Sequence, residues 1–174
     1  LEIGTQKKGR VKYMFSSNGI GYQVAKYVSN KNDIEGTITS ASFFLVEKTK
    51  ESQKIRPLLI SKDSFDYRPK QVIIPKSKII EVGKKKGWIE IDISELNLTF
   101  PKEGLFIGLE FLTENDEVEV NNRLNIGLQP FEKEEYTWVK YLGSDWNIPP
   151  FLRDSKNRRL NLMIKVKIES PIGK

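Results

Sequence analysis

The sequence predicts an all-β protein, a two-sheet antiparallel β-sandwich that is jelly-roll-like, with about eight to ten strands and almost no helix. Three observations predict this fold. Most apolar runs alternate with polar residues at a period of two, which is the side-chain period of a strand. Two further runs are apolar at nearly every position, as expected of strands covered on both faces. Turns rich in Gly, Pro, Asn and Asp separate the runs, and no long segment has the 3.6-residue period of a helix.

The clearest alternation lies near the C-terminus, in residues 159–168. One face of this predicted strand is apolar and points to the core: Leu160, Leu162, Ile164, Val166 and Ile168. The other face is predicted to meet solvent: Arg159, Asn161, Met163, Lys165 and Lys167. Residues 11–15, 89–93 and 96–100 alternate in the same way. All are typical of half-buried antiparallel strands.

The two continuous apolar runs, residues 42–46 and 104–112, belong in the middle of a sheet. Residues 55–60 form a weaker candidate, and Pro57 makes it an edge or irregular strand. Residues 71–74, 124–128 and 136–142 are further candidates. We expect the core to contain Phe43, Leu45, Ile89, Ile91, Ile107, Leu109, Leu162, Ile164 and Val166. With no repeat and no shift in composition, residues 1–174 are predicted to form a single β-sandwich domain.

The composition limits which catalytic groups the protein can use. The 174 residues include no cysteine and no histidine, so thiolate nucleophiles, the commonest general base and the commonest metal ligand are all missing. We therefore predict a non-catalytic domain. The enzyme alternative is a carboxylate-based glycoside hydrolase, for which Glu90 and Asp92 lie on one face of a predicted strand.

The net charge is +6, with a pI of about 9.3. Lysines alternate with glutamates opposite apolar residues, which is typical of a solvated sheet face, so we expect no nucleic-acid partner. The triplet Lys84–Lys86 is interpreted as a charged hairpin tip, with phosphate or acidic-glycan binding as the alternative. No segment has the roughly 20 apolar residues of a transmembrane span.

A candidate ligand site surrounds an aromatic segment: Trp138, Tyr141, Asp145, Trp146 and Asn147. Aromatic rings can stack on the apolar face of a sugar while Asn and Asp side chains hydrogen-bond its hydroxyls. The alternative is structural, with the indoles buried and holding the loop in place.

The acidic segment that contains Glu114, Asp116 and Glu117 offers oxygen ligands of the kind that calcium prefers. It lacks the ordered spacing of an EF-hand, and acidic solvated loops are commoner than calcium sites. We expect no cofactor, with a structural calcium ion as the alternative.

Several segments in order carry a resemblance to a known family: residues 3–5, 18–25, 36–38, 41–43, 87–94 and 104–110, which read IGT, NGIGYQVA, GTI, ASF, GWIEIDIS and GLFIGLE. This order resembles poorly characterised galactose-binding-like jelly-roll domains of exported bacterial proteins, often found downstream of a carboxypeptidase-regulatory-like module. The resemblance implies an extracytoplasmic location, periplasmic or at the cell surface. It implies a binding or accessory role, and it transfers no catalytic residue. Together with the aromatic segment, this role makes a glycan or a neighbouring protein domain the expected partner. The alternative to a ligand-binding role is a structural or interaction domain that docks a neighbouring domain or a partner protein.

Overall fold

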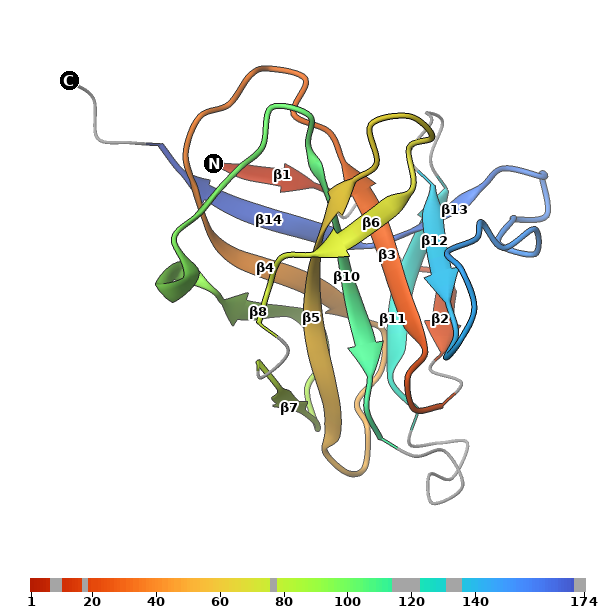
Figure 1. The fold of residues 1–174 in the computed structure, drawn as a ribbon. Coiled ribbons are helices and arrows are strands. Elements are labelled where there is room, and N and C mark those ends of the chain that lie inside the picture. Colours follow the sequence, from red (N-terminus) through yellow and green to blue (C-terminus); the bar gives the residue numbers. More distant parts are fainter. Residues whose placement is uncertain (7–10, 17–18, 76–77, 114–122, 131–135, 171–174) are drawn as a thin grey trace.

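Two antiparallel sheets stack face to face in the computed structural model, which describes residues 1–174 except 7–10, 17–18, 76–77, 114–122, 131–135 and 171–174 (Figure 1). The described residues form fourteen strands, more and shorter than expected, and one 3-10 turn, η1 (Ser94–Leu96). Every strand pair in both sheets is antiparallel. The predicted all-β sandwich is therefore confirmed.

The larger sheet contains eight strands among the described residues. They are β1 (Glu2–Gly4), β2 (Tyr13–Ser16), β4 (Thr37–Leu45), β8 (Gly87–Asp92), β9 (Leu98–Thr99), β11 (Asn125–Pro130), β13 (Leu160–Leu162) and β14 (Ile164–Glu169). Its order is β1-β14-β4-β11-β13, while β8 and β9 also pair with β4 and β2 pairs with β11. The apolar run at residues 42–46 thus lies mostly in the central strand β4, as predicted.

The smaller sheet contains six described strands. They are β3 (Gln23–Val28), β5 (Gln53–Lys62), β6 (Pro69–Val72), β7 (Ile80–Val82), β10 (Leu105–Phe111) and β12 (Thr137–Lys140). Its order is β12-β3-β10-β5-β6, with β7 also on β5. The predicted buried run at residues 104–112 is β10, in the middle of this sheet.

The main core fills the space between the sheets. Eight of the nine predicted core residues are buried: Phe43, Leu45, Ile91, Ile107, Leu109, Leu162, Ile164 and Val166. Ile89 is only half-buried and packs against the edge of this core, whereas Ile91, two residues further along β8, is 4% exposed.

The C-terminal run departs from the prediction. It forms two strands, and Asn161 and Met163, expected in solvent, are 1% and 0% exposed. The chain passes from a place beside β11 to a place beside β4 at this point. Met163 joins the two, since its N–H donates to Gly127 and its carbonyl accepts from Phe44. Thr137 of the smaller sheet covers Asn161, with 3.3 Å between Thr137 Oγ1 and Asn161 Oδ1.

Pro57 occupies the local edge that its missing N–H requires. Strand β5 lies between β10 and β6 and is not an edge strand as a whole. However, β7 pairs only with residues Gln53–Ile55, and the β6 pairing begins at Ile60. Pro57 therefore sits in the gap between these two partners, where no described strand needs its N–H.

One charged side chain lies inside the sandwich. Lys26 is 1% exposed and alternates with Val24 and Val28 on the core face of β3. Its Nζ donates to Thr5 Oγ1 at 3.1 Å, and that hydroxyl donates to the carbonyl of Leu162 at 3.1 Å. This chain of hydrogen bonds ties the N-terminal segment to both sheets.

Candidate binding site

In the aromatic segment predicted as a ligand site, the two Trp side chains pack against the sheet and the Tyr141 side chain is exposed. Trp138 is 8% exposed and packs edge-on against Phe106, with ring centroids 6.2 Å apart. Trp146 is half-buried against the same apolar cluster, which lies on the outer face of the six-stranded sheet. Tyr141 is exposed, and its ring lies 5.8 Å from that of Tyr22.

The backbone explains why the two indoles share a face. Asn147 and Val139 exchange two hydrogen bonds, so residues 146–148 run antiparallel beside β12. In this register Trp146 and Trp138 lie on the same side of the sheet. Asp145 and Asn147 are exposed. Both indoles thus pack against the sheet, and Tyr141 offers the most open ring; ligand binding at this segment stays a prediction.

The acidic candidates for calcium, Glu114, Asp116 and Glu117, lie outside the described residues. Within the described part of the chain, no group of three or more acidic side chains is placed to hold a metal ion. The calcium alternative therefore stays untested.

The carboxylates considered for hydrolysis lie on exposed positions of β8. Glu90 accepts a hydrogen bond from Ser40 Oγ at 2.6 Å. Asp92 accepts from the side chain and backbone of Ser94, and these bonds lower the pKa of the Asp92 carboxyl. A general acid in glycoside hydrolysis requires a raised pKa, so this environment does not favour that role for Asp92.

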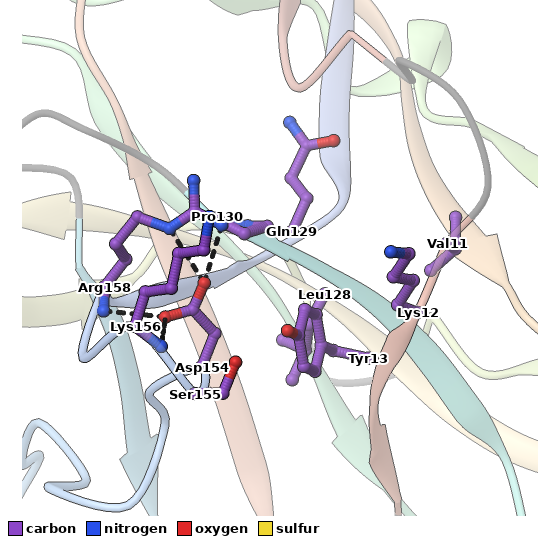
Figure 2. Close-up of a pocket in the computed structure, with 10 residues that line it drawn as sticks. All are labelled: Val11, Lys12, Tyr13, Leu128, Gln129, Pro130, Asp154, Ser155, Lys156 and Arg158. Atoms are coloured by element: carbon purple, nitrogen blue, oxygen red, sulfur yellow. Dashed lines mark hydrogen bonds and ion pairs between the residues drawn. The ribbon is translucent and has the colours of Figure 1, made fainter.

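A hollow of about 350 Å³ lies elsewhere, beside the pair of strands β2 and β11. Ten residues line it: Val11, Lys12, Tyr13, Leu128, Gln129, Pro130, Asp154, Ser155, Lys156 and Arg158. Figure 2 shows the residues of the 151–159 loop on one side, Val11 and Lys12 on the other, and Tyr13 with Leu128 between them. Three segments far apart in the sequence therefore meet here.

A second hollow of about 420 Å³ adjoins the first and shares Lys12, Tyr13 and Leu128 with it. Its other lining residues include the exposed side chains Met14 and Phe151. We call the two hollows together the β2 groove. One part of the groove is rich in cations, and the other part has an apolar rim.

The wall of the β2 groove on the side of the 151–159 loop is organised by Asp154. Its side chain is only 1% exposed. One oxygen, Oδ1, accepts from the backbone N–H groups of Lys156 and Arg158 at 2.9 and 2.8 Å. The other, Oδ2, accepts from Arg158 Nε at 2.8 Å and Nη2 at 2.7 Å. Backbone pairing of Arg153 with Arg159 closes the base of the loop.

The electrostatics of this wall follow from those bonds. Burial acts to raise the pKa of the Asp154 carboxyl, but hydrogen bonds from the backbone and side chain of Arg158 and from the backbone of Lys156 outweigh it and lower the pKa. Asp154 is therefore an anion at neutral pH. Within the described part of the chain, its negative charge is paired with Arg158, and the cations Lys12 and Lys156 also line the groove.

Sequence reasoning did not find the β2 groove, because its parts are joined only by strand pairing and by the return of the 151–159 loop. A local signal was present. The segment Asp154-Ser155-Lys156-Asn157-Arg158 places an Asp where its carboxylate can accept from backbone N–H groups two and four residues later.

Comparisons with known proteins relate this chain to a fold. No protein-family model matches the sequence, and no curated protein matches it. Two solved structures resemble it, both of the protein Cwp84. The clostridial cysteine protease Cwp84 after propeptide cleavage has a TM-score of 0.55 at 13% identity, over 88% of this chain and 36% of that one. The second, the cysteine protease and lectin-like domains of Cwp84, a surface layer associated protein of Clostridium difficile, has a TM-score of 0.54 at 13% identity, over 93% of this chain and 36% of that one.

At this identity the likeness concerns the fold, and the chain spans 36% of the length of each matched structure. Within the described residues, the structure contains no helix long and apolar enough to cross a membrane.

Proposed function

We propose that this chain is a non-catalytic, extracytoplasmic module that binds saccharide in the β2 groove. The observation that carries the proposal is the composition of the groove. Its floor combines the ring of Tyr13 with the apolar side chain of Leu128, and hydrogen-bonding side chains such as Gln129 and Arg158 surround it. Saccharide sites in proteins need this combination, since a sugar ring has both an apolar face and a rim of hydroxyls.

The rigidity of the groove supports the same proposal. Tyr13 and Leu128 are direct partners in the β2–β11 pair, so both are held by a strand ladder. The opposite wall is a loop fixed by the four hydrogen bonds to Asp154. A site whose walls are already fixed loses less conformational freedom when a ligand binds.

The fold comparison adds weaker support. The matched protein contains a cysteine protease domain and a lectin-like domain, and this chain contains no cysteine. We infer that its counterpart is the lectin-like domain. An extracytoplasmic location is proposed on the same basis, because the matched protein is associated with a surface layer. The galactose-binding-like resemblance, the docking-domain alternative and the hydrolase alternative stay predictions.

Isothermal titration of the chain with a panel of defined tetrasaccharides tests the proposal. Binding is expected with a dissociation constant between about 1 mM and about 1 μM, which corresponds to about −4 to −8 kcal/mol. Tyr13→Ala should weaken it by about tenfold, because the ring supplies the stacking surface, while Tyr141→Ala should change it less than about twofold. Absence of binding across the panel would refute the proposal. Release of new reducing ends from the tetrasaccharides would instead support the hydrolase alternative.

A further inference from the structure

We propose that the β2 groove selects an anionic saccharide, one that bears carboxylate or sulfate groups, over a neutral one. This inference rests on the proposed function and concerns the ligand class of the same site. It follows from the charges of the residues that line the cation-rich hollow and from the hydrogen bonds that those residues already make.

Among the described residues that line that hollow, Asp154 carries the one carboxylate, and it has no acceptor capacity left for a ligand. A carboxylate offers about four lone-pair positions. All of them are used at Asp154, where Oδ1 accepts from two backbone N–H groups and Oδ2 accepts twice from the Arg158 guanidinium. Asp154 therefore shapes the wall of the groove, but it does not serve as the acceptor that neutral sugar hydroxyls require.

The donors, in contrast, are in excess. Lys12 and Lys156 are exposed, and within the described part of the chain neither side chain forms a hydrogen bond or an ion pair. The Arg158 side chain is 46% exposed and binds Asp154 through Nε and Nη2, which leaves Nη1 for a ligand. Lys and Arg side chains donate hydrogen bonds and cannot accept them. Gln129, Ser155 and Tyr13 also line the hollow and can accept as well as donate, so the preference comes from the unmatched positive charges, which favour acceptors that carry negative charge, such as carboxylates and sulfates.

The cations are also placed to act together. Figure 2 shows Lys12 on one side of Tyr13 and Leu128, and Lys156 and Arg158 on the other. A sugar ring over Tyr13 would thus have cationic donors at both edges. The hollow of about 350 Å³ lies in the size range of small-ligand sites. Charge-assisted hydrogen bonds at these edges favour an acidic sugar over its neutral counterpart.

The test is isothermal titration of the whole chain with tetragalacturonate, a sulfated tetrasaccharide, and neutral galactotetraose. Both anionic ligands are expected to bind about tenfold or more tightly than the neutral one. Raising the salt from about 0.1 M to about 1 M shortens the screening length from about 10 Å to about 3 Å, so the preference should shrink. The double variant Lys12→Ala/Lys156→Ala should lose about tenfold toward the anionic ligands and little toward the neutral one.

The matched control is Lys31→Ala/Lys102→Ala, which removes the same charge from two exposed turn positions that do not line the groove. It should leave all affinities within about twofold. Equal binding of neutral and anionic ligands would overturn this inference and leave the proposed function standing. If no saccharide binds, the proposed function fails and the inference fails with it. If a single-stranded oligonucleotide of equal charge binds as tightly as tetragalacturonate, the groove is a general polyanion site and the inference is wrong.

Discussion

Replacing Leu128 by alanine tests whether the β2 groove is a real hollow against the core. Leu128 is 2% exposed, belongs to the main core, and lines both parts of the groove. The change removes about three methylene equivalents at about 0.8 kcal/mol each, or about 2.4 kcal/mol of transfer free energy. Because the groove already opens beside this side chain, solvent can fill the space left, and the cavity contribution should be small. We expect a loss of about 2–3 kcal/mol in the free energy of unfolding.

The control is Leu109→Ala, at a fully buried position in β10 between β3 and β5. A void there stays empty, so the loss should be larger, about 3–5 kcal/mol. Urea unfolding followed by tryptophan fluorescence measures both, provided that the m-values stay equal to that of the wild type. The reasoning fails if Leu128→Ala costs as much as Leu109→Ala, since the groove would then not reach Leu128. It also fails if Leu128→Ala costs less than about 1 kcal/mol.

Three further predictions concern the loop, the sheets and the aromatic segment. The pKa of the Asp154 carboxyl is lower in the folded protein than in the unfolded chain, where it is about 3.9. Ionised Asp154 therefore stabilises the fold above about pH 3.9, and this stabilisation is lost as the pH falls through the folded pKa. Asp154→Asn should remove this dependence and flatten the acid side of a curve of Tm against pH. Gly108→Ala should destabilise by about 1–3 kcal/mol in urea, since its Cβ would lie 2.1 Å from a backbone oxygen of β3. Gly143→Asn should cost less, about 1 kcal/mol, because nothing lies near its Cβ and the cost is only the left-handed backbone at φ of 78°, which Asn tolerates better than most residues. Trp138→Ala should cost about 3–5 kcal/mol and Tyr141→Ala less than about 1 kcal/mol, because Trp138 is 8% exposed and Tyr141 is 53% exposed; equal losses would contradict the placement of the two rings.

The strands of this fold were readable from the sequence because a half-buried strand leaves a period of two. That signal weakens where both faces are covered. Asn161 and Met163 were assigned to solvent by alternation, but a step between neighbouring strands and the cover supplied by Thr137 bury them. Lys26 was not predicted to be buried, yet it lies on the core face of β3 with Val24 and Val28, where it donates a hydrogen bond to Thr5.

The candidate site was less predictable, for a physical reason. Clustered aromatic residues in a sequence suggest a binding site, but a large ring can equally pack in a core. Trp138 packs in this way, buried against Phe106. The β2 groove depends on which distant strands pair. Tyr13 meets Leu128 only through the β2–β11 ladder, and Lys156 reaches them only because Asp154 folds the loop back. No local pattern in the sequence contains that juxtaposition.

The most direct test of the central claim is a titration of the isotopically labelled chain with tetragalacturonate, followed by amide chemical shifts. If the β2 groove binds an anionic saccharide, the largest shifts will arise at Tyr13, Gln129 and Lys156, and they will be suppressed by Lys12→Ala/Lys156→Ala. Shifts that are largest around Tyr141 and Trp146, with the groove unaffected, would contradict the account and return the site to the aromatic segment.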